Sequence, residues 1–273
     1  MNFNKAVIDK LLKSNNLLDT VDYREEDLII EKYLKGNTPC VITGLADKWS
    51  ARGWTMGYIK ELCGEVEMVI RRYNYDTLKI EDKKTRVADY IDYVIQNEQN
   101  PDINPYYANG NLNPPPVLWD DYDIPDYLKC NFDNFRNDPT KMTFSWIFIA
   151  PKYGLTRLHT DIIHSFNWNL VISGKKLWVY YPDEQVPYIN HGLVNPFAPD
   201  LELNPDFEKT DPITYLQGPG DIVFTPSPWW HAVLNLEMGV SLTENFINQY
   251  DIKNVKDYCV ENGIPTPELS YAM

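Results

Sequence analysis

The chain has 273 residues, of which 44% are hydrophobic and 23% charged, and its formal net charge at pH 7 is -14. This length and apolar content suffice for one large domain with a substantial core. The acidic balance argues against direct binding to nucleic acid or to an anionic membrane surface, because phosphate would be repelled. A basic protein or peptide partner is compatible with the charge, although an acidic balance is more often a solubility feature.

The first 140 residues mix helical and strand patterns. Apolar residues recur at helical spacing in 4–14, 22–34, 55–62 and 87–95, which predicts amphipathic helices packed outside a sheet. Thr55 is the expected N-cap of the third helix, and Gly64 its C-cap glycine. Short apolar or β-branched runs predict strands at 40–43, 66–72 and 105–108. The polar composition of 73–84 predicts a loop, and the prolines of 111–126 predict an irregular surface connection.

From residue 142 onward, short strands follow one another between turn residues. Aromatic and β-branched runs predict strands at 143–150, 156–161, 165–173, 176–181, 222–225, 232–236 and 240–246. Such a succession is typical of a sandwich or barrel, and a jelly roll would enclose an interior pocket. We expect one structural domain with residues 1–140 flanking and extending the barrel, 141–250 forming the jelly-roll core, and 251–273 a short C-terminal segment. A helix at 255–260 would either support a dimer or cap the barrel.

The cysteines are scattered and form no C-x-x-C pair: Cys40, Cys63, Cys130 and Cys259. This predicts reduced thiols of an intracellular protein, cytoplasmic or nuclear, and neither a disulfide framework nor a zinc cluster. No apolar run approaches the roughly eighteen residues that a membrane span needs. No apolar segment follows the first residues either, so we expect no signal peptide.

A histidine and an aspartate two residues apart, His159 and Asp161, indicate a candidate metal site. If both lie on one strand, the two-residue period places both side chains on one face, where they can bind a single ion. His231 would complete a set of two histidines and one carboxylate. That set is typical of non-haem Fe(II) enzymes, which keep about three octahedral positions open. The H-x-D pattern alone often occurs by chance, so its surroundings matter.

The surroundings carry a family resemblance. The runs concerned are Thr156 to Asp161, Trp168 to Leu170, Gly174 to Trp178, Tyr181-Pro182, Gly218 to Pro226, Trp229 to His231 and Thr243 to Phe246. In these runs the chain resembles the JmjC-domain Fe(II)/2-oxoglutarate dioxygenases, and more narrowly the small JmjC protein hydroxylases, with the lysyl hydroxylases nearest and the asparaginyl hydroxylases more distant. The resemblance spans roughly residues 22–248. It implies a mainly β fold with flanking α-helices, the double-stranded β-helix or cupin-like jelly roll.

The resemblance also implies roles for individual residues. His159, Asp161 and His231 match the iron ligands, Lys176 matches the lysine that pairs with the far carboxylate of 2-oxoglutarate, Thr156 and Tyr107 match hydroxyls that bind the same carboxylate, Asn169 and Thr243 match further pocket positions, and Asn245 matches a position near the metal. Each has an ordinary structural alternative. Lys176 would be an exposed turn lysine beside Lys175, the threonines plain β-formers, and Tyr107 a core residue.

The function implied by the resemblance is the hydroxylation of a protein side chain, lysine first, with Fe(II), 2-oxoglutarate and O2 as cofactors and succinate and CO2 as products. Ascorbate is a further candidate cofactor. A JmjC N-methyl-lysine demethylase is the close rival, although many demethylases carry glutamate where this chain has Asp161. A non-catalytic cupin-like binding protein is an alternative from another class. The oligomeric state stays open, a dimer included.

Overall fold

Two β-sheets face each other and form the body of the protein. A computed structural model describes residues 3–74, 77–108, 112–130 and 144–264. The six-stranded sheet has the order β1 (Asp19–Asp22), β2 (Cys40–Thr43), β10 (Ile222–Thr225), β7 (Phe166–Val171), β12 (Gly239–Phe246) and β5 (Ser145–Ala150). The four-stranded sheet has the order β6 (Leu155–His159), β11 (Trp230–Asn235), β8 (Lys176–Tyr181) and β9 (Ile213–Gln217). Within these sheets only β1 and β2 pair in parallel.

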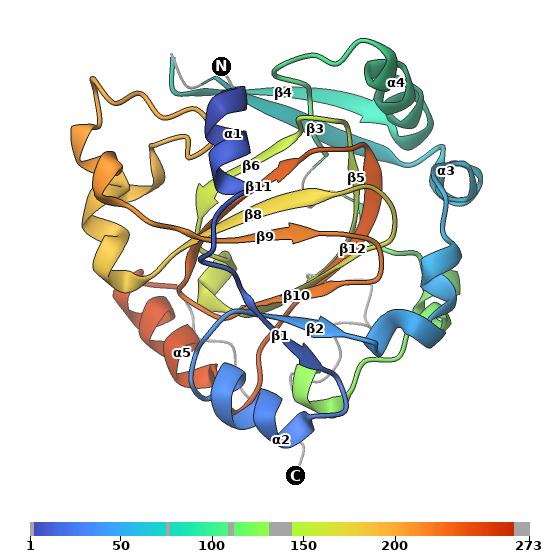
Figure 1. Ribbon diagram of the computed structural model, residues 1–273. Coiled ribbons are helices and arrows are strands. Elements are labelled where there is room, and N and C mark those ends of the chain that lie inside the picture. The colour runs from blue at the N-terminus through green and yellow to red at the C-terminus, as the bar shows by residue number, and fades with distance from the viewer. Residues whose placement is uncertain (1–2, 75–76, 109–111, 131–143, 265–273) are drawn as a thin grey trace.

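A two-stranded hairpin and several helices surround this body. The hairpin is β3 (Glu67–Asn74) with β4 (Lys79–Arg86). The helices are α1 (Lys5–Leu11), α2 (Glu26–Leu28) with the π-helix Ile29–Leu34, α3 (Met56–Cys63), α4 (Val87–Gln99) and α5 (Ile252–Glu261). Short 3-10 helices cover Leu45–Lys48, Ser50–Gly53, Pro116–Asp121, Asp126–Leu128, Ile162–His164, Asp183–Tyr188, Asn190–Gly192 and Pro205–Lys209. The hairpin and α4 lie at one end of the body, and α2 and α5 at the other (Figure 1).

Three apolar clusters hold the layers together. The largest joins the outer face of the six-stranded sheet to residues of the π-helix, α3 and α4, among them Ile29, Ile59 and Ile91. A second covers the outer face of the four-stranded sheet and includes Ile8 of α1. A third lies between the two sheets. The resulting sandwich with flanking helices confirms the mainly β jelly-roll class. No helix within the described ranges combines the length and apolar character that crossing a membrane requires.

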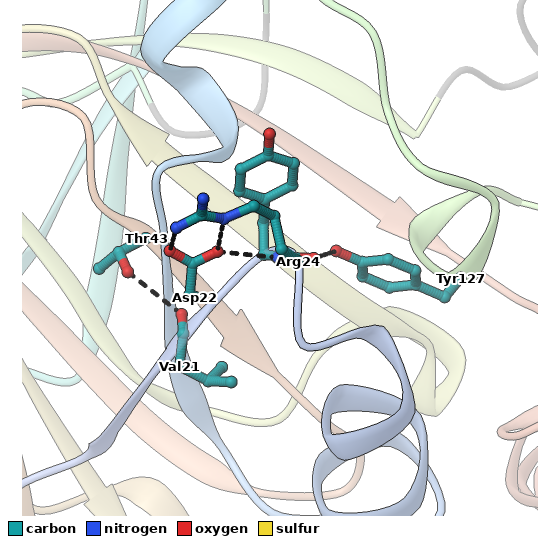
Figure 2. A network of polar contacts seen from close by, with 6 residues as sticks. Val21, Asp22, Arg24, Thr43 and Tyr127 are labelled. Atoms are coloured by element: carbon teal, nitrogen blue, oxygen red, sulfur yellow. Dashed lines mark hydrogen bonds and ion pairs between the residues drawn. The ribbon is translucent and has the colours of Figure 1, made fainter.

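The N-terminal strands are part of the larger sheet. β2 pairs with both β1 and β10. Figure 2 shows the junction, where the Thr43 hydroxyl donates to the Val21 carbonyl at 3.2 Å and the Tyr127 hydroxyl donates to the Tyr23 carbonyl at 3.1 Å. The second bond ties the 3-10 helix Asp126–Leu128 to the end of β1. Strands β1 and β2, which lie far before the predicted barrel core in the chain, thus belong to the larger sheet of the barrel. The predicted boundary at residue 140 between flanking elements and core stays a prediction.

Most predicted elements are confirmed, some with shifted ends. The predicted strand at 165–173 is shorter, and those at 40–43, 176–181 and 222–225 keep their predicted ends. The predicted strand at 143–150 starts at Ser145, and residue 143 lies outside the described residues. Gly64 ends α3 as expected, but its φ of -54° is right-handed and not that of a left-handed cap.

One predicted helix starts late, and other predictions are wrong. The helix predicted for 22–34 is confirmed only over Glu26–Leu34, because its first predicted residue ends β1, which pairs with β2 and buries Val21. The loop predicted for 73–84 contains most of β4, which has no apolar alternation because nearly all its side chains are exposed or half-exposed. The strand at 105–108 is reduced to isolated bridges from Tyr107 and Ala108. β9 was not predicted.

Helix α5 packs on its own chain. Its buried residues Val255 and Cys259 contact Ile247, and the Asp251 carboxylate just before it accepts hydrogen bonds from the amides of Asn248 at 2.7 Å and Phe166 at 3.1 Å. Burial raises the pKa of Asp251 from 3.8 to about 7, although both backbone bonds oppose the shift. The helix therefore covers one end of the barrel.

We expect Asp251→Asn to destabilise the protein by about 1–3 kcal/mol at pH 5, because the amide nitrogen cannot accept one of the two buried backbone bonds. Because folding raises the pKa of the Asp251 carboxyl, this group stabilises the fold most below pH 3.8. The stabilisation is lost as the pH rises toward about 7. The asparagine variant does not undergo this loss, so the difference between its free energy of unfolding and that of the wild type should be smaller at pH 8. Urea unfolding at both pH values measures this. An equal deficit at pH 5 and pH 8 would contradict the raised pKa.

Candidate metal centre

Polar side chains line the inner face of the six-stranded sheet. β7 and β12 are buried along their whole length. Their register places Asn169 opposite Thr243 and Asn167 opposite Asn245. Side chains alternate along a strand, so these four share the face opposite to Trp168, which lies in the outer core. The larger sheet therefore presents amides and hydroxyls to the interior of the sandwich.

Three side chains from the facing sheet and the turn after it converge next to this polar face. His159, the last residue of β6, pairs with His231 of β11, and their ring centroids are 4.3 Å apart. Ligand atoms of His159, Asp161 and His231 all lie within 4.8 Å of one another. The Oδ2 atom of Asp161 is buried and has no hydrogen-bond partner among the described residues. Two imidazoles and an orphaned carboxylate oxygen in this space fit a single metal ion.

Asp161 reaches the cluster differently from the prediction. The strand predicted for 156–161 ends at His159, and Asp161 precedes the 3-10 helix Ile162–His164 with φ -64° and ψ 157°. These angles are still extended, so a spacing of two residues still brings both side chains within reach of each other. Burial raises the pKa of the Asp161 carboxyl, while His159 and a hydrogen bond from Asn245 oppose the shift.

Backbone carbonyls fix the orientation of both imidazoles. Nδ1 of His159 lies 2.8 Å from the Arg157 carbonyl, and Nδ1 of His231 lies 3.1 Å from the Trp229 carbonyl. A carbonyl only accepts hydrogen bonds, so each Nδ1 carries a proton and each Nε2 keeps its lone pair for a ligand bond. Burial, followed by the neighbouring His159, lowers the pKa of His231 well below its ordinary value. The neutral imidazole is the form that binds metal.

A β-bulge explains how Thr156 shares the interior with His159. Residues three apart on a regular strand point to opposite faces. Here His231 pairs with His159, but Val233 pairs with Thr156, so three residue steps on β6 match two on β11. The extra residue of a bulge resets the alternation. Thr156 consequently faces the same cavity as the histidine.

Lys176 is buried deep between the sheets and is only 5% exposed. Its ammonium donates to the Ser241 hydroxyl at 2.6 Å and to the Asn169 amide oxygen at 3.4 Å, and lies 5.4 Å from the centre of the Phe148 ring. No carboxylate among the described residues forms an ion pair with it. Burial accordingly lowers the pKa of Lys176 to about 7. A buried cation without an anionic partner fits an anionic ligand.

One cavity joins these groups, with about 420 Å³ of space, part of it open to solvent. Its lining contains every site residue named from the sequence: His159, Asp161, His231, Lys176, Thr156, Tyr107, Asn169, Thr243 and Asn245. Tyr107 is buried, and its hydroxyl interacts with Thr156 and Asn235. The structure thus brings the named residues together, whereas their roles toward a metal or a cosubstrate stay proposals.

The cavity also contains residues that were not named as site residues. Asn167 donates to the Thr243 hydroxyl at 2.9 Å and to the Asn245 amide oxygen at 3.1 Å. Trp178 stacks on His231 with ring centroids 5.8 Å apart. Asn167 and Asn169 alternate in a strand that is otherwise apolar, a signal that points to a polar inner face. Trp178 had no such signal, because a tryptophan in a buried strand is ordinary core.

Comparison with known proteins places the chain in a family. It belongs to the cupin-like domain family, whose model matches residues 26–252. The fold and family resemblance inferred from the motifs is thereby confirmed.

Relatives with assigned names are similar over most of this chain. The arginine-specific demethylase JMJ22 of Arabidopsis thaliana is 27% identical over 263 residues, which cover 91% of this chain and 49% of the relative. The Caenorhabditis elegans protein psr-1, a bifunctional arginine demethylase and lysyl-hydroxylase, is 27% identical over 76% of this chain and 55% of its own. The 2-oxoglutarate and iron-dependent oxygenase JMJD4 of Gallus gallus is 27% identical over 79% and 56%. The chain spans about half the length of these relatives.

Proposed function

We propose that the protein is an Fe(II)- and 2-oxoglutarate-dependent oxygenase that hydroxylates a side chain of a protein substrate, with lysine favoured. The observation that carries the proposal is one cavity in which His159, Asp161 and His231 converge beside a buried Lys176 that has no ion-pair partner among the described residues. A metal site alone would not need the lysine. A buried lysine alone would not need the three ligands.

Each part of the cavity would have a distinct task. His159, Asp161 and His231 would hold iron and leave about three positions for other ligands. Lys176 would pair with the far carboxylate of 2-oxoglutarate, with hydrogen bonds from Thr156 and Tyr107 beside it. Iron and 2-oxoglutarate together supply the oxidation of a C–H bond by O2, with release of succinate and CO2. The aromatic and apolar walls would limit the entry of water.

The choice of substrate rests on the relatives and on charge. Psr-1 is named as a lysyl-hydroxylase, which favours lysine. The net charge of -14 would attract a basic segment over a distance. Demethylation is the second candidate, because JMJ22 and psr-1 are both named as arginine demethylases. A protein substrate is common to both readings.

The expected result is succinate release from 2-oxoglutarate that depends on added Fe(II). A chelator should lower the rate at least about tenfold, and excess Fe(II) should restore it, because His159, Asp161 and His231 would hold the metal that the reaction needs. Mass spectrometry of lysate proteins treated with active protein should show residues heavier by one oxygen. Loss of a methyl group would instead select demethylation. A protein that binds neither Fe(II) nor 2-oxoglutarate would be a non-catalytic binding protein.

A further inference from the structure

A second cavity adjoins the first on the side of the β3–β4 hairpin. It encloses about 780 Å³ of space, part of it open to solvent, and shares Tyr107, Thr156 and His159 with the metal cavity. The remaining lining comes from β3, β4, β6 and the segment 104–105. In Figure 1 the hairpin lies across the end of the barrel next to β6. A ligand in this second cavity would therefore touch the wall of the metal centre.

The charge of this cavity is opposite to that of the chain. Its lining holds Arg71, Arg72 and Arg157, and none of its described lining residues is a carboxylate. In a chain with a net charge of -14, three arginines at one cavity are a local reversal of sign. Arg72 is already engaged, because it pairs with Glu81 at 2.6 Å and lies 4.7 Å from the centre of the Tyr106 ring. The other two guanidiniums are less compensated.

Arg157 is the better placed of these two. Its guanidinium carbon lies 4.4 Å from the centre of the Tyr73 ring, and no carboxylate among the described residues forms an ion pair with it. Stacking on a ring holds the guanidinium plane while leaving its N–H donors at the edge available. Arg71 pairs with Asp82 only at 3.4 Å, and both side chains are about half exposed. Such a surface pair stabilises little and is easily exchanged for another anion.

The apolar part of the cavity suits an extended chain segment. Ile80 is 54% exposed, and together with Leu155 and Pro105 it gives the cavity an apolar surface. The hairpin is also fixed to the metal cavity, because the amide and carbonyl of Arg71 exchange hydrogen bonds of 3.1 and 2.8 Å with those of Tyr107. A group bound by the arginines would thus be held at a set distance from the proposed iron site.

We propose that this second cavity, defined by Arg71, Arg157, Tyr73, Ile80, Leu155 and Pro105, binds a carboxylate of the protein substrate and so selects which target residue enters the metal cavity. The inference rests on the proposed oxygenase function. The carboxylate has two sources with the same chemistry, an Asp or Glu side chain near the target residue or the α-carboxylate at a chain terminus. Arg157 is a specificity residue in this reading and takes no part in the oxidation. Long-range attraction of a basic protein and local binding of one carboxylate are compatible.

The test measures binding as well as turnover. The peptides have twelve residues and a fixed central lysine. In the first comparison one flanking position at a time carries either Glu or Gln. In the second comparison the same peptide ends in either a free carboxylate or an amide. Affinity is measured on the Mn(II)- and 2-oxoglutarate-loaded protein, and turnover on the Fe(II)-loaded protein. At one or more positions the carboxylate form should bind about tenfold more tightly, which corresponds to about 1.4 kcal/mol. Added salt should reduce this preference.

Variants then assign the preference to the cavity. Arg157→Met should remove it, whereas Arg24→Met, a distant and exposed arginine paired with Asp22, should keep it. A preference at an internal position identifies a side-chain carboxylate, and a preference for the free terminus identifies the α-carboxylate. Equal binding of both forms, no peptide binding at all, or a preference that survives in Arg157→Met would overturn the proposal. The proposal would also be overturned if the only effect of Arg157→Met were a higher KM for 2-oxoglutarate.

Failure of this proposal and failure of the oxygenase proposal give different results. If the carboxylate preference is absent while iron-dependent succinate release persists, only the second cavity has been misassigned. If succinate release is absent while the Mn(II)-loaded protein still prefers carboxylate peptides through Arg157, the binding site stands and the oxygenase proposal fails.

Discussion

Asp161→Ala is expected to weaken Fe(II) binding by about a thousandfold and to reduce succinate release to background. Four-ligand zinc sites bind with about 10–16 kcal/mol, so one ligand of three contributes several kcal/mol, and about 4 kcal/mol is a factor of a thousand. The carboxylate is also the only anionic member of the set of His159, Asp161 and His231. Metal content after dialysis and succinate release measure the two effects.

The same substitution should leave the metal-free protein as stable as before or more stable. Oδ2 of Asp161 is buried without a hydrogen-bond partner among the described residues, so in the absence of metal this oxygen costs free energy. Thermal unfolding measures this. Without metal, the Tm of Asp161→Ala should equal or exceed that of the wild type, and adding metal should no longer raise it. The control is Asp206→Ala, because Asp206 is an exposed aspartate paired with Lys209. This variant should retain both Fe(II) binding and succinate release. Full metal binding by Asp161→Ala would rule out the proposed site.

The strands that carry the site were predictable because they are buried and bounded by turns. Phe166–Val171 and Lys176–Tyr181 are apolar runs with isolated polar residues. The register of β7 with β12 turns Asn167 and Asn169 toward the cavity that Lys176 lines from the facing sheet. The convergence of His159 with His231 needed more than a local pattern. Seventy-two residues separate them in the chain, and the family resemblance supplied the pairing.

Other features left no pattern for a sequence to show. Strict alternation would have placed Thr156 and His159 on opposite faces, and only the bulge between β6 and β11 reconciles them. β4 has no apolar face because its side chains are all exposed or half-exposed, while β3 beside it buries Met68 and Ile70. The contact of Arg157 with Tyr73 joins residues distant in the chain. The charge reversal at the second cavity therefore arises only on folding, and net charge gave no indication of it.

Lys176→Met is the substitution with the second large expected effect, a rise of about a hundredfold or more in the Kd for 2-oxoglutarate. Removing one partner of a buried ion pair costs about 3–5 kcal/mol, because the other charge is left without compensation. Tryptophan fluorescence of the Mn(II)-loaded protein measures the Kd, since Trp178 lines the same cavity as Lys176. Fe(II) binding should change little, because the lysine is not among the three candidate ligands.

The lysine should also make cosubstrate binding and stability depend on pH in opposite ways. Burial lowers its pKa from 10.5 to about 7, so above pH 7 the free protein must take up a proton to bind a dianion, and the Kd should rise by up to about tenfold per pH unit. The unfolded chain holds that proton up to about 10.5, so Lys176 lowers the stability of the ligand-free fold most below pH 7. Methionine removes this cost, and its stabilising effect should fade toward pH 10.

Lys175→Met is the matched control for both effects. It lies next in the chain, is about half exposed and pairs with Glu237 at 2.7 Å, so neither the Kd nor the stability should change by more than a small amount. Three results would contradict the role given to Lys176: an unchanged Kd in Lys176→Met, a loss of stability in the ligand-free variant, or a Kd for wild type that is flat between pH 6.5 and 8.5. Each result would mean that the hydrogen bonds of the Lys176 ammonium to Ser241 and Asn169 suffice for it, and that it does not bind the carboxylate of 2-oxoglutarate.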